Sequence, residues 1–156
     1  MSRSGAELAL LLLGGFRTLA DAATAELAAQ GHQDFRPVHD FALRAIGSGA
    51  DNASELGRRM SVTKQAAAKT IAVLLERGYI SRDADPADAR RKLLRVTPLG
   101  FTVMRDGEAI FDLLHTEWER KIGADALAEL EAQLAILVGD SRIRIDAPGW
   151  VSQQSG

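Results

Sequence analysis

The residues best suited to chemistry in this sequence are polar and cationic side chains between positions 61 and 91. Lys64 and Gln65 begin a predicted helix, where free backbone N–H groups and the helix dipole attract phosphate. Glutamine can bond both edge atoms of adenine, and lysine can donate to guanine or to phosphate. Arg90 and Arg91 lie in a charged hairpin, and the negative potential of a minor groove favours arginine. These residue types indicate a surface for duplex DNA.

Two short helices joined by a tight turn must hold this polar set. Asn52 is predicted to cap the first helix, over residues 53–60, and Glu55 to complete a capping box. Thr63 is predicted to cap the second helix, over residues 64–77. This spacing is typical of a helix-turn-helix, whose second helix enters a major groove.

The outward side of the second helix supplies the first group of expected DNA contacts. Its apolar residues recur at core spacing, which leaves the opposite side polar or small. Capping and turn formation explain the hydroxyl residues better than base contact does, and helix propensity explains the small residues equally well. The expected contacts are Ser61, Thr63, Lys64, Gln65, Ala68 and Lys69.

A charged hairpin supplies the second group of expected contacts. Residues 79–82 are predicted as a short strand, 83–91 as a charged loop and 92–96 as the return strand. Asp88 precedes Arg90 by two residues and is predicted to pair with it, which would orient the arginine more than it would add stability. The expected contacts from the hairpin are Asp88, Arg90 and Arg91.

Charge is distributed unevenly along the chain. The net charge of −2 by itself weighs against a nucleic-acid-binding protein. Residues 54–97, however, carry ten Lys or Arg against five Asp or Glu, while the remaining residues carry nine against sixteen. A basic block within an acidic scaffold is expected when only one part of a protein touches phosphates. A solvated charged face would explain the same counts equally well.

Composition indicates one globular domain and excludes several kinds of site. The 156 residues are 46% hydrophobic, enough to bury a core. Cysteine is absent, which excludes disulfides, thiolate metal ligands and a thiol-oxidation trigger. The apolar stretch 8–16 is shorter than the roughly 18 residues needed to span a membrane, and no signal-peptide pattern surrounds it. We therefore expect a soluble cytoplasmic protein with no membrane partner.

Amphipathic helices are predicted on both sides of the helix-turn-helix and hairpin. The first half of the first helix is apolar nearly all round, so we expect it to pack against more than its own domain. Asp125 is the expected N-cap of the last helix, and the tail at 140–156 shows no strong pattern. The predicted helices are residues 5–30 and 38–46 before the motif, and 98–122 and 126–138 after it.

The hairpin carries a family signature. It contains Asp88-Ala89-Arg90 and then Val96-Thr97-Pro98-Leu99-Gly100, which resembles the D-x-R … L-T-x-x-G wing of the MarR (multiple antibiotic resistance regulator) family. Upstream, ASELGRRMSVTKQAAAKTIAVLLERGYI resembles the family's helix-turn-helix and its trailing L-E-x-x-G motif. The resemblance covers nearly the whole chain. It departs from the pattern where Ala67 and Thr70 replace larger aliphatic residues and Val96 replaces leucine.

The resemblance implies a fold and a function. The fold is mainly α, an α+β winged helix with about six helices and a two-stranded hairpin. In a single domain, 1–156, it places the winged helix-turn-helix at 52–97 and a helical dimerisation frame at 5–48 and 98–139. A two-fold dimer sets two recognition helices about one DNA turn apart on a pseudo-palindromic operator. The implied function is a homodimeric, sequence-specific transcriptional regulator, a repressor released by a small aromatic acid-like ligand.

The resemblance also implies an effector pocket between the dimerisation frame and the winged helix. In this family such pockets often accept small aromatic acids. Core packing explains aromatic residues in this region equally well. The candidates to line the pocket are His39, Phe41, Phe111, His115 and Trp118.

Catalysis is not indicated. The histidines at 32, 39 and 115 show no metal-ligand motif and no nearby nucleophile, and there is no glycine-rich phosphate loop. We expect no enzyme activity, no metal and no cofactor. The alternative function is a winged-helix protein-interaction module that does not bind DNA. Four cations, Lys64, Lys69, Arg90 and Arg91, favour DNA binding.

Overall fold

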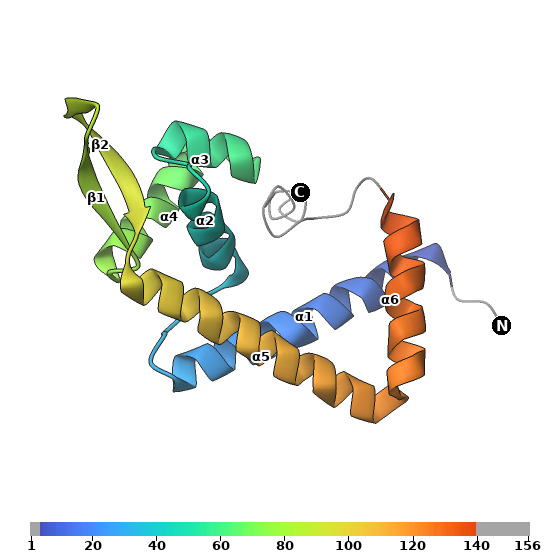
Figure 1. Ribbon diagram of the computed structural model, residues 1–156. Helices are drawn as coiled ribbons and strands as arrows, with labels where there is room; N and C mark the ends of the chain where they lie inside the picture. The colour runs from blue at the N-terminus through green and yellow to red at the C-terminus, as the bar shows by residue number, and fades with distance from the viewer. Residues whose placement is uncertain (1–3, 140–156) are drawn as a thin grey trace.

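A computed structural model describes residues 4–139 and arranges them as six helices and one antiparallel hairpin (Figure 1). This mainly α winged-helix architecture confirms the expected fold class. The predicted tail, residues 140–156, lies outside the described residues. The elements are α1 (Gly5–Ala29), α2 (Pro37–Gly47), α3 (Ala53–Met60), α4 (Lys64–Glu76), β1 (Ile80–Asp85), β2 (Asp88–Val96), α5 (Pro98–Ile122) and α6 (Ala124–Val138).

Polar side chains cap the helices of the winged helix where the sequence predicts them. Asn52 Oδ1 accepts the backbone N–H of Glu55 at 2.9 Å, and Thr63 Oγ1 accepts that of Ala66 at 3.1 Å. Thr97 caps α5 in the same way. Each cap satisfies a backbone donor that the helix itself cannot, which is typically worth ~1 kcal/mol.

Two helix starts differ from the prediction. The capping box of α3 is only half formed, because the carboxylate of Glu55 pairs with Arg58 and Arg59. Hydrogen bonds to a guanidinium are stronger than one to a neutral backbone N–H. The N-cap position of α6 is Gly123, so Asp125 lies inside the first turn, where its charge complements the helix dipole.

The strands of the wing are longer than predicted and its loop is shorter. Only Pro86 and Ala87 separate the strands, in place of the predicted loop 83–91. The register runs from the Ile80–Val96 pair outward and becomes irregular near the tip. A two-stranded ribbon exposes both faces at its tip, so charged side chains do not oppose pairing there. The wing cations therefore extend from strands and not from a loop.

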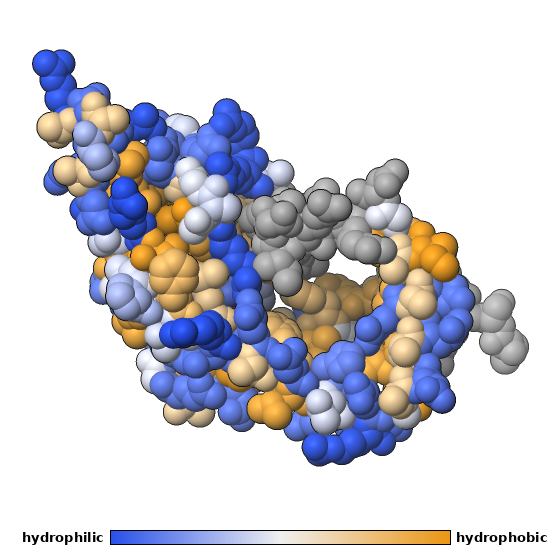
Figure 2. Space-filling model, in the orientation of Figure 1, coloured by the Kyte–Doolittle hydropathy of each residue, from blue (hydrophilic) through white to orange (hydrophobic). Residues whose placement is uncertain are grey.

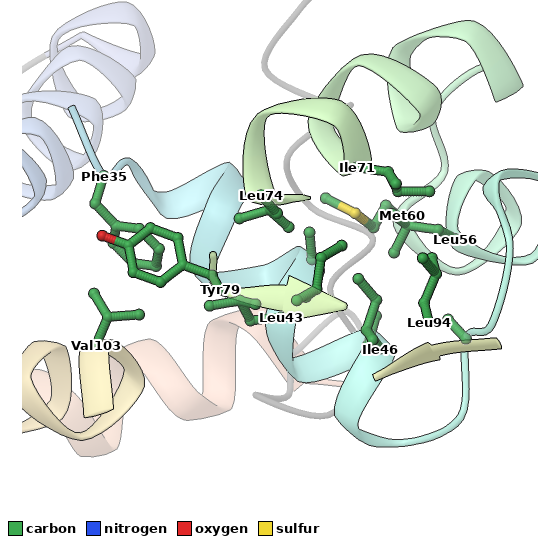
Figure 3. Close-up of a cluster of buried hydrophobic side chains, with 14 of the residues drawn as sticks. Phe35, Leu43, Ile46, Leu56, Met60, Ile71, Leu74, Tyr79, Leu94 and Val103 are labelled. Atoms are coloured by element: carbon green, nitrogen blue, oxygen red, sulfur yellow. The ribbon is translucent and has the colours of Figure 1, made fainter. Parts of the chain in front are cut away.

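The core lies beneath the helix-turn-helix (Figure 3). Burying each of its large side chains stabilises the fold by ~1.5–3 kcal/mol. The buried face of α2, which the sequence assigned to the dimerisation frame, also contributes to this core. The core residues labelled in Figure 3 are Phe35, Leu43, Ile46, Leu56, Met60, Ile71, Leu74, Tyr79, Leu94 and Val103.

Two glycines permit close backbone contacts around this core. A Cβ on Gly57 of α3 would lie 3.0 Å from the carbonyl oxygen of Val62, so a side chain there would push the turn away from α3. A Cβ on Gly100 would overlap the carbonyl of Tyr79, where the start of α5 presses against the base of the wing. Ser61 closes the turn in the left-handed region, at φ 54°, which non-glycine residues seldom adopt.

Three long helices extend away from the winged helix. α5 runs from the wing toward α6, α1 packs across α5, and α6 turns back at the far end (Figure 1). In α6 only Leu127 is buried, and Figure 2 shows apolar surface at the far end of that helix. The large apolar side chains that these helices expose are Leu8, Leu10, Leu11, Leu12, Leu99, Phe101, Phe111, Leu113, Ile122, Leu130, Ile136, Leu137 and Val138.

The apolar character of α1 extends beyond its leucine run. By length and composition alone, α1 could cross a bilayer: its mean hydropathy reaches 1.4 over an 18-residue window, of which 11% is buried. The sequence expectation considered only the stretch 8–16, whereas the alanine-rich second half extends the apolar character. A helix this exposed needs a covering surface, whether protein or lipid.

Candidate nucleic-acid interface

The recognition helix α4 presents its polar residues on one exposed side. Lys64, Gln65, Ala68 and Lys69 are all exposed, whereas Ala67, Ile71 and Leu74 are buried on the opposite side. That apolar side anchors α4 on the core and leaves the first turn free to approach a ligand. The sequence predicted this division correctly.

The hydroxyl residues at the turn have structural roles. Thr63 accepts the N–H of Ala66, and Ser61 forms the left-handed corner between α3 and α4. Both side chains are exposed beside the first turn of α4. Because a capping hydroxyl accepts a hydrogen bond, it keeps its own proton available for donation to a phosphate.

Asp88 bonds a different group of Arg90 from the one predicted. Its Oδ1 accepts the backbone N–H of Arg90 at 3.0 Å, and no ion pair joins the two side chains within residues 4–139. A short aspartate closes such a turn with the N–H two residues on without having to order a long arginine. The guanidinium of Arg90 is therefore exposed at the wing and is not held by Asp88.

Arg91 is held at the edge of the wing. Its Nη2 lies 2.9 Å from Oδ2 of Asp51, a residue in the segment before α3. The arginine side chain remains about half exposed, at 54%, and the aspartate 28%. Of the two arginines that the sequence proposed for DNA, one is paired within the protein.

A cleft joins the recognition helix to the wing. Arg82 of β1 and Lys92 of β2 line it together with Ala68 and Ile71 of α4. Sequence reasoning missed both cations as contacts. Strand pairing places Arg82 opposite Leu94, and Lys92 is two residues from Leu94 on the same side of β2. Had the longer strands been recognised, that alternation would have placed both cations facing α4.

Two side chains of the winged helix, Arg77 and Tyr79, bond the segment that connects α1 to α2. Arg77, which caps α4 at its C-terminus, donates to the carbonyl oxygens of Gln33 at 2.8 Å and Asp34 at 3.1 Å. Nearby, the Tyr79 hydroxyl lies 2.8 Å from His32 Nδ1, and His32 Nε2 lies 3.2 Å from Asp106 of α5. Burial raises the pKa of Tyr79, so its hydroxyl stays protonated. These bonds couple the position of α4 to the α1–α2 connection.

An apolar pocket lies between α1, α2 and α5. Phe41 and Phe111, both predicted as effector contacts, line it, and its polar rim includes Asp40, Arg44 and Glu108. Arg44 bridges the two carboxylates, at 2.8 Å to Asp40 and 3.0 Å to Glu108. Burial raises the pKa of Asp40, although the hydrogen bond from Arg44 opposes the shift.

The other predicted effector residues lie elsewhere. His115 and Trp118 line a different hollow, between α1, α5 and α6, which also includes Phe111. His39 is buried at the start of α2, where its Nδ1 accepts the backbone N–H of Arg36 at 2.9 Å and burial lowers its pKa. The five candidates are thus divided among three environments.

Metal binding finds no support in the described part of the chain. Within residues 4–139, no group of three or more His, Asp or Glu side chains could hold a metal ion. His115 contacts two carboxylates, Glu119 at 3.1 Å and Glu131 at 2.6 Å. This group joins α5 to α6.

The comparisons with known proteins agree with this geometry. A MarR family model matches residues 41–91, from within α2 to within β2. A comparison with curated protein sequences finds no significant match.

Solved structures share the fold at low sequence identity. The reduced form of MarR from E. coli superposes with a TM-score of 0.68 at 21% identity, covering 88% of this chain and 98% of that one. FabT from Streptococcus pneumoniae in complex with DNA gives 0.67 at 18% identity, covering 86% and 94%. CouR from Rhodococcus jostii RHA1, bound to p-coumaroyl-CoA, gives 0.58 at 21% identity, covering 92% and 100%.

The sequence match covers the helix-turn-helix and most of the wing, and the fold extends the likeness over the long helices. The exposed side of α4 and the cationic wing lie together, as DNA binding requires. Residues 41–91 therefore resemble the MarR family, and the described chain shares the winged-helix fold of MarR from E. coli and FabT from Streptococcus pneumoniae.

Proposed function

We propose that this protein is a cytoplasmic, homodimeric repressor that binds a pseudo-palindromic operator and releases it when a small aromatic acid binds. The observation that carries the proposal is the set of exposed cations on α4 and the wing, with Arg82 and Lys92 in the cleft between them. Such a surface neutralises phosphates while the first turn of α4 enters the major groove.

Within this proposal, the exposed residues of α4 divide the work of recognition. Gln65 contacts a base edge, and Lys64 and Lys69 donate to guanine or phosphate, because all three are exposed on one side of the helix. Ala68 allows the helix to approach the groove closely. Ser61 and Thr63 donate their hydroxyl protons to phosphates of the DNA backbone. Arg90, exposed on the wing, enters the adjacent minor groove.

The homodimer is proposed from the uncovered apolar side chains of α1 and α6. Leu10 is 66% exposed, Ile136 73% and Leu137 78%, and soluble monomers rarely expose such contiguous patches. A second copy would cover both helices by an isologous contact. It would also supply the second recognition helix that a pseudo-palindrome requires.

The effector site is proposed at the pocket between α1, α2 and α5. Its walls are apolar and include Phe16, Phe41 and Phe111, which suit an aromatic ring. Arg36 at its mouth holds Asp34 at 2.6 Å, and a ligand carboxylate would compete for that arginine. Asp34 also lies 3.9 Å from Arg77 at the end of α4, so this exchange would reach the recognition helix. The acyl ligand of CouR supports an aromatic compound of this general kind.

Salt-dependent DNA binding tests the central claim. A labelled duplex from upstream of the protein's own coding sequence and a random duplex of equal length are titrated by fluorescence anisotropy over a range of salt. We expect tighter binding to the upstream duplex, and log K falling with log salt by about 0.9 for each phosphate neutralised. Binding that is absent, or equal for the two duplexes at every salt concentration, contradicts the operator proposal.

A ligand screen tests the release step separately. Salicylate, benzoate and p-coumarate are added to the preformed complex, with acetate as the non-aromatic control. We expect the aromatic acids alone to lower DNA affinity and to raise the Tm of the free protein. If they change neither quantity, the effector claim fails and the operator claim stands. DNA binding absent under all conditions would instead favour a protein-interaction module.

A further inference from the structure

The segment just before α3 holds the outer edge of the wing through one residue, Asp51. Its carbonyl oxygen accepts the backbone N–H of Leu94 at 3.3 Å, on the edge of β2 that β1 does not cover. Its carboxylate accepts from Arg91 at 2.9 Å and from the Asn52 side chain at 2.7 Å. The same Asn52 caps α3 through its side-chain oxygen. One residue thus connects the wing to the helix-turn-helix.

The position of Asp51 is unusual for a surface that attracts phosphate. It lines the cleft between α4 and the wing beside Arg82 and Lys92. Its carboxylate neutralises a cation that could otherwise face phosphate, so its presence there calls for another role. Its two bonds to β2 are three residues apart along that strand, at Arg91 and Leu94, which is enough to fix the direction in which the wing projects.

The geometry points to Asp51 as a positioning residue for DNA binding, with Arg91 as its partner within the protein and not as a DNA contact. Arg90, whose guanidinium no carboxylate holds within residues 4–139, is then the wing arginine that reaches the groove. This inference rests on the proposed operator binding. A flexible wing must be ordered when DNA binds, whereas a wing already held by Asp51 avoids that loss of entropy.

Two explanations of the Asp51–Arg91 pair predict opposite changes in operator affinity. If Asp51 positions the wing, Asp51→Asn weakens operator binding by about fivefold, the scale of one surface ion pair. If Asp51 merely competes with phosphate for Arg91, the same substitution frees a cation and tightens binding. Under the positioning role, Arg91→Ala weakens binding to the same extent without changing the salt slope. A phosphate contact would instead lose about one unit of slope.

The test combines these variants with a matched control. Asp83 pairs with Arg95 at 3.5 Å on the same hairpin, and both side chains are about half exposed. Asp83→Asn removes an equal charge from the wing without touching the edge of β2, so we expect affinity equal to or above that of the natural protein. Asp51→Asn, Arg91→Ala and the double variant are compared on both duplexes, with Tm measured for each.

The expected result is that Asp51→Asn and Arg91→Ala lower affinity equally, and that the double variant is no worse than either. Unchanged or tighter binding by Asp51→Asn, or additive losses in the double variant, would overturn the inference.

Hydrogen exchange keeps the test independent of DNA. Amides of residues 88–96 should exchange faster in Asp51→Asn than in Asp83→Asn, because the edge of β2 is released. If the natural protein bound neither duplex, the operator proposal would fail, and this exchange comparison alone would decide whether Asp51 holds the wing. Equal exchange in the two variants overturns the positioning role.

Discussion

The winged helix and the three long helices bury their apolar residues to very different extents. The winged helix encloses Leu56, Met60 and Leu74 almost completely and presents charge outward. α1 and α6 instead leave most of their leucines in solvent, and α6 buries only Leu127. A single chain therefore completes the core of the winged helix but not that of the long helices. The difference indicates that the winged helix folds on internal contacts, while the long helices leave apolar side chains that the proposed dimer would cover.

The largest expected effect comes from placing a charge in the uncovered half. Leu10→Asp and Leu137→Asp should convert the proposed dimer to a monomer near 16.8 kDa, because each buries a carboxylate in an apolar contact. Light scattering after size exclusion measures the mass. Operator affinity should fall by at least about a hundredfold when the two recognition helices act separately.

Ala25→Asp, at an exposed position of α1 outside the leucine run, is the control and should leave the mass unchanged. A natural protein that is already monomeric contradicts the proposed dimer. Co-sedimentation of that monomer with lipid vesicles would assign the apolar face of α1 to a bilayer.

The next effect tests how tightly the winged helix is packed at its junction with α5. Gly100→Ala should lower the free energy of unfolding by ~1–3 kcal/mol, because its Cβ would overlap the Tyr79 carbonyl. Gly107→Ala on the same helix has no atom within 4 Å of its Cβ and should gain ~0.5–1 kcal/mol from helix propensity. Urea unfolding measures both, and equal effects would remove the argument for close packing at Gly100.

A third effect separates binding from folding within the winged helix. Arg90→Ala should weaken operator binding by about tenfold and leave Tm unchanged, because the side chain is exposed on the wing. Arg105→Ala, an exposed arginine of α5, is the control and should change neither quantity. Anisotropy and thermal unfolding give the two measurements. Unchanged affinity in Arg90→Ala would remove the wing from the mechanism.

A smaller effect concerns sequence preference. Gln65→Ala should reduce discrimination among operators that carry single base substitutions by about fivefold at one position. Binding to the random duplex should change little, because glutamine neutralises no phosphate. A competition assay across the substituted sites measures the effect. A uniform loss of affinity on all duplexes would show that Gln65 does not discriminate bases.

The smallest effect contrasts two histidines. The hydrogen bond with Glu131 raises the pKa of exposed His115. Its contribution to folding stability is therefore complete below about pH 6.5 and is lost as pH rises through the raised pKa. Burial lowers the pKa of His39. Its contribution to folding stability is therefore present above about pH 6.5 and is lost as pH falls through the lowered pKa. NMR titration of the two imidazoles checks the directions. His115→Gln should flatten the alkaline side of the Tm profile only.

Much of the winged helix was predictable because its signals are local. Asn52, Thr63 and Thr97 cap helices by bonding residues three positions away, so their types alone locate helix starts. The exposed side of α4 follows from helical periodicity. The wing was less predictable, because each of its charged strands is stabilised by pairing with the other strand and not by a local sequence pattern. The loop predicted at 83–91 is therefore mostly strand.

The candidate site shows the same limit. Sequence reasoning proposed Lys64, Gln65 and Arg90 as DNA contacts but did not propose Arg82 and Lys92, whose approach to α4 depends on strand register. The predicted effector residues lie in different places, because long-range packing and local capping decided their positions. Phe41 and Phe111 line one pocket, whereas His39 was recruited to cap α2.

The sequence by itself determined the order of elements, the polar side of α4 and the resemblance to the MarR family, because these depend on short-range spacing and residue type. Only the tertiary structure decided the partner of Arg91. Asp51 lies forty residues before it, and no spacing rule links them. The same holds for Asp88, which bonds a backbone N–H in place of the neighbouring guanidinium. Long-range pairs form where packing brings charges together, and that geometry exists only once the core has placed the wing against α3.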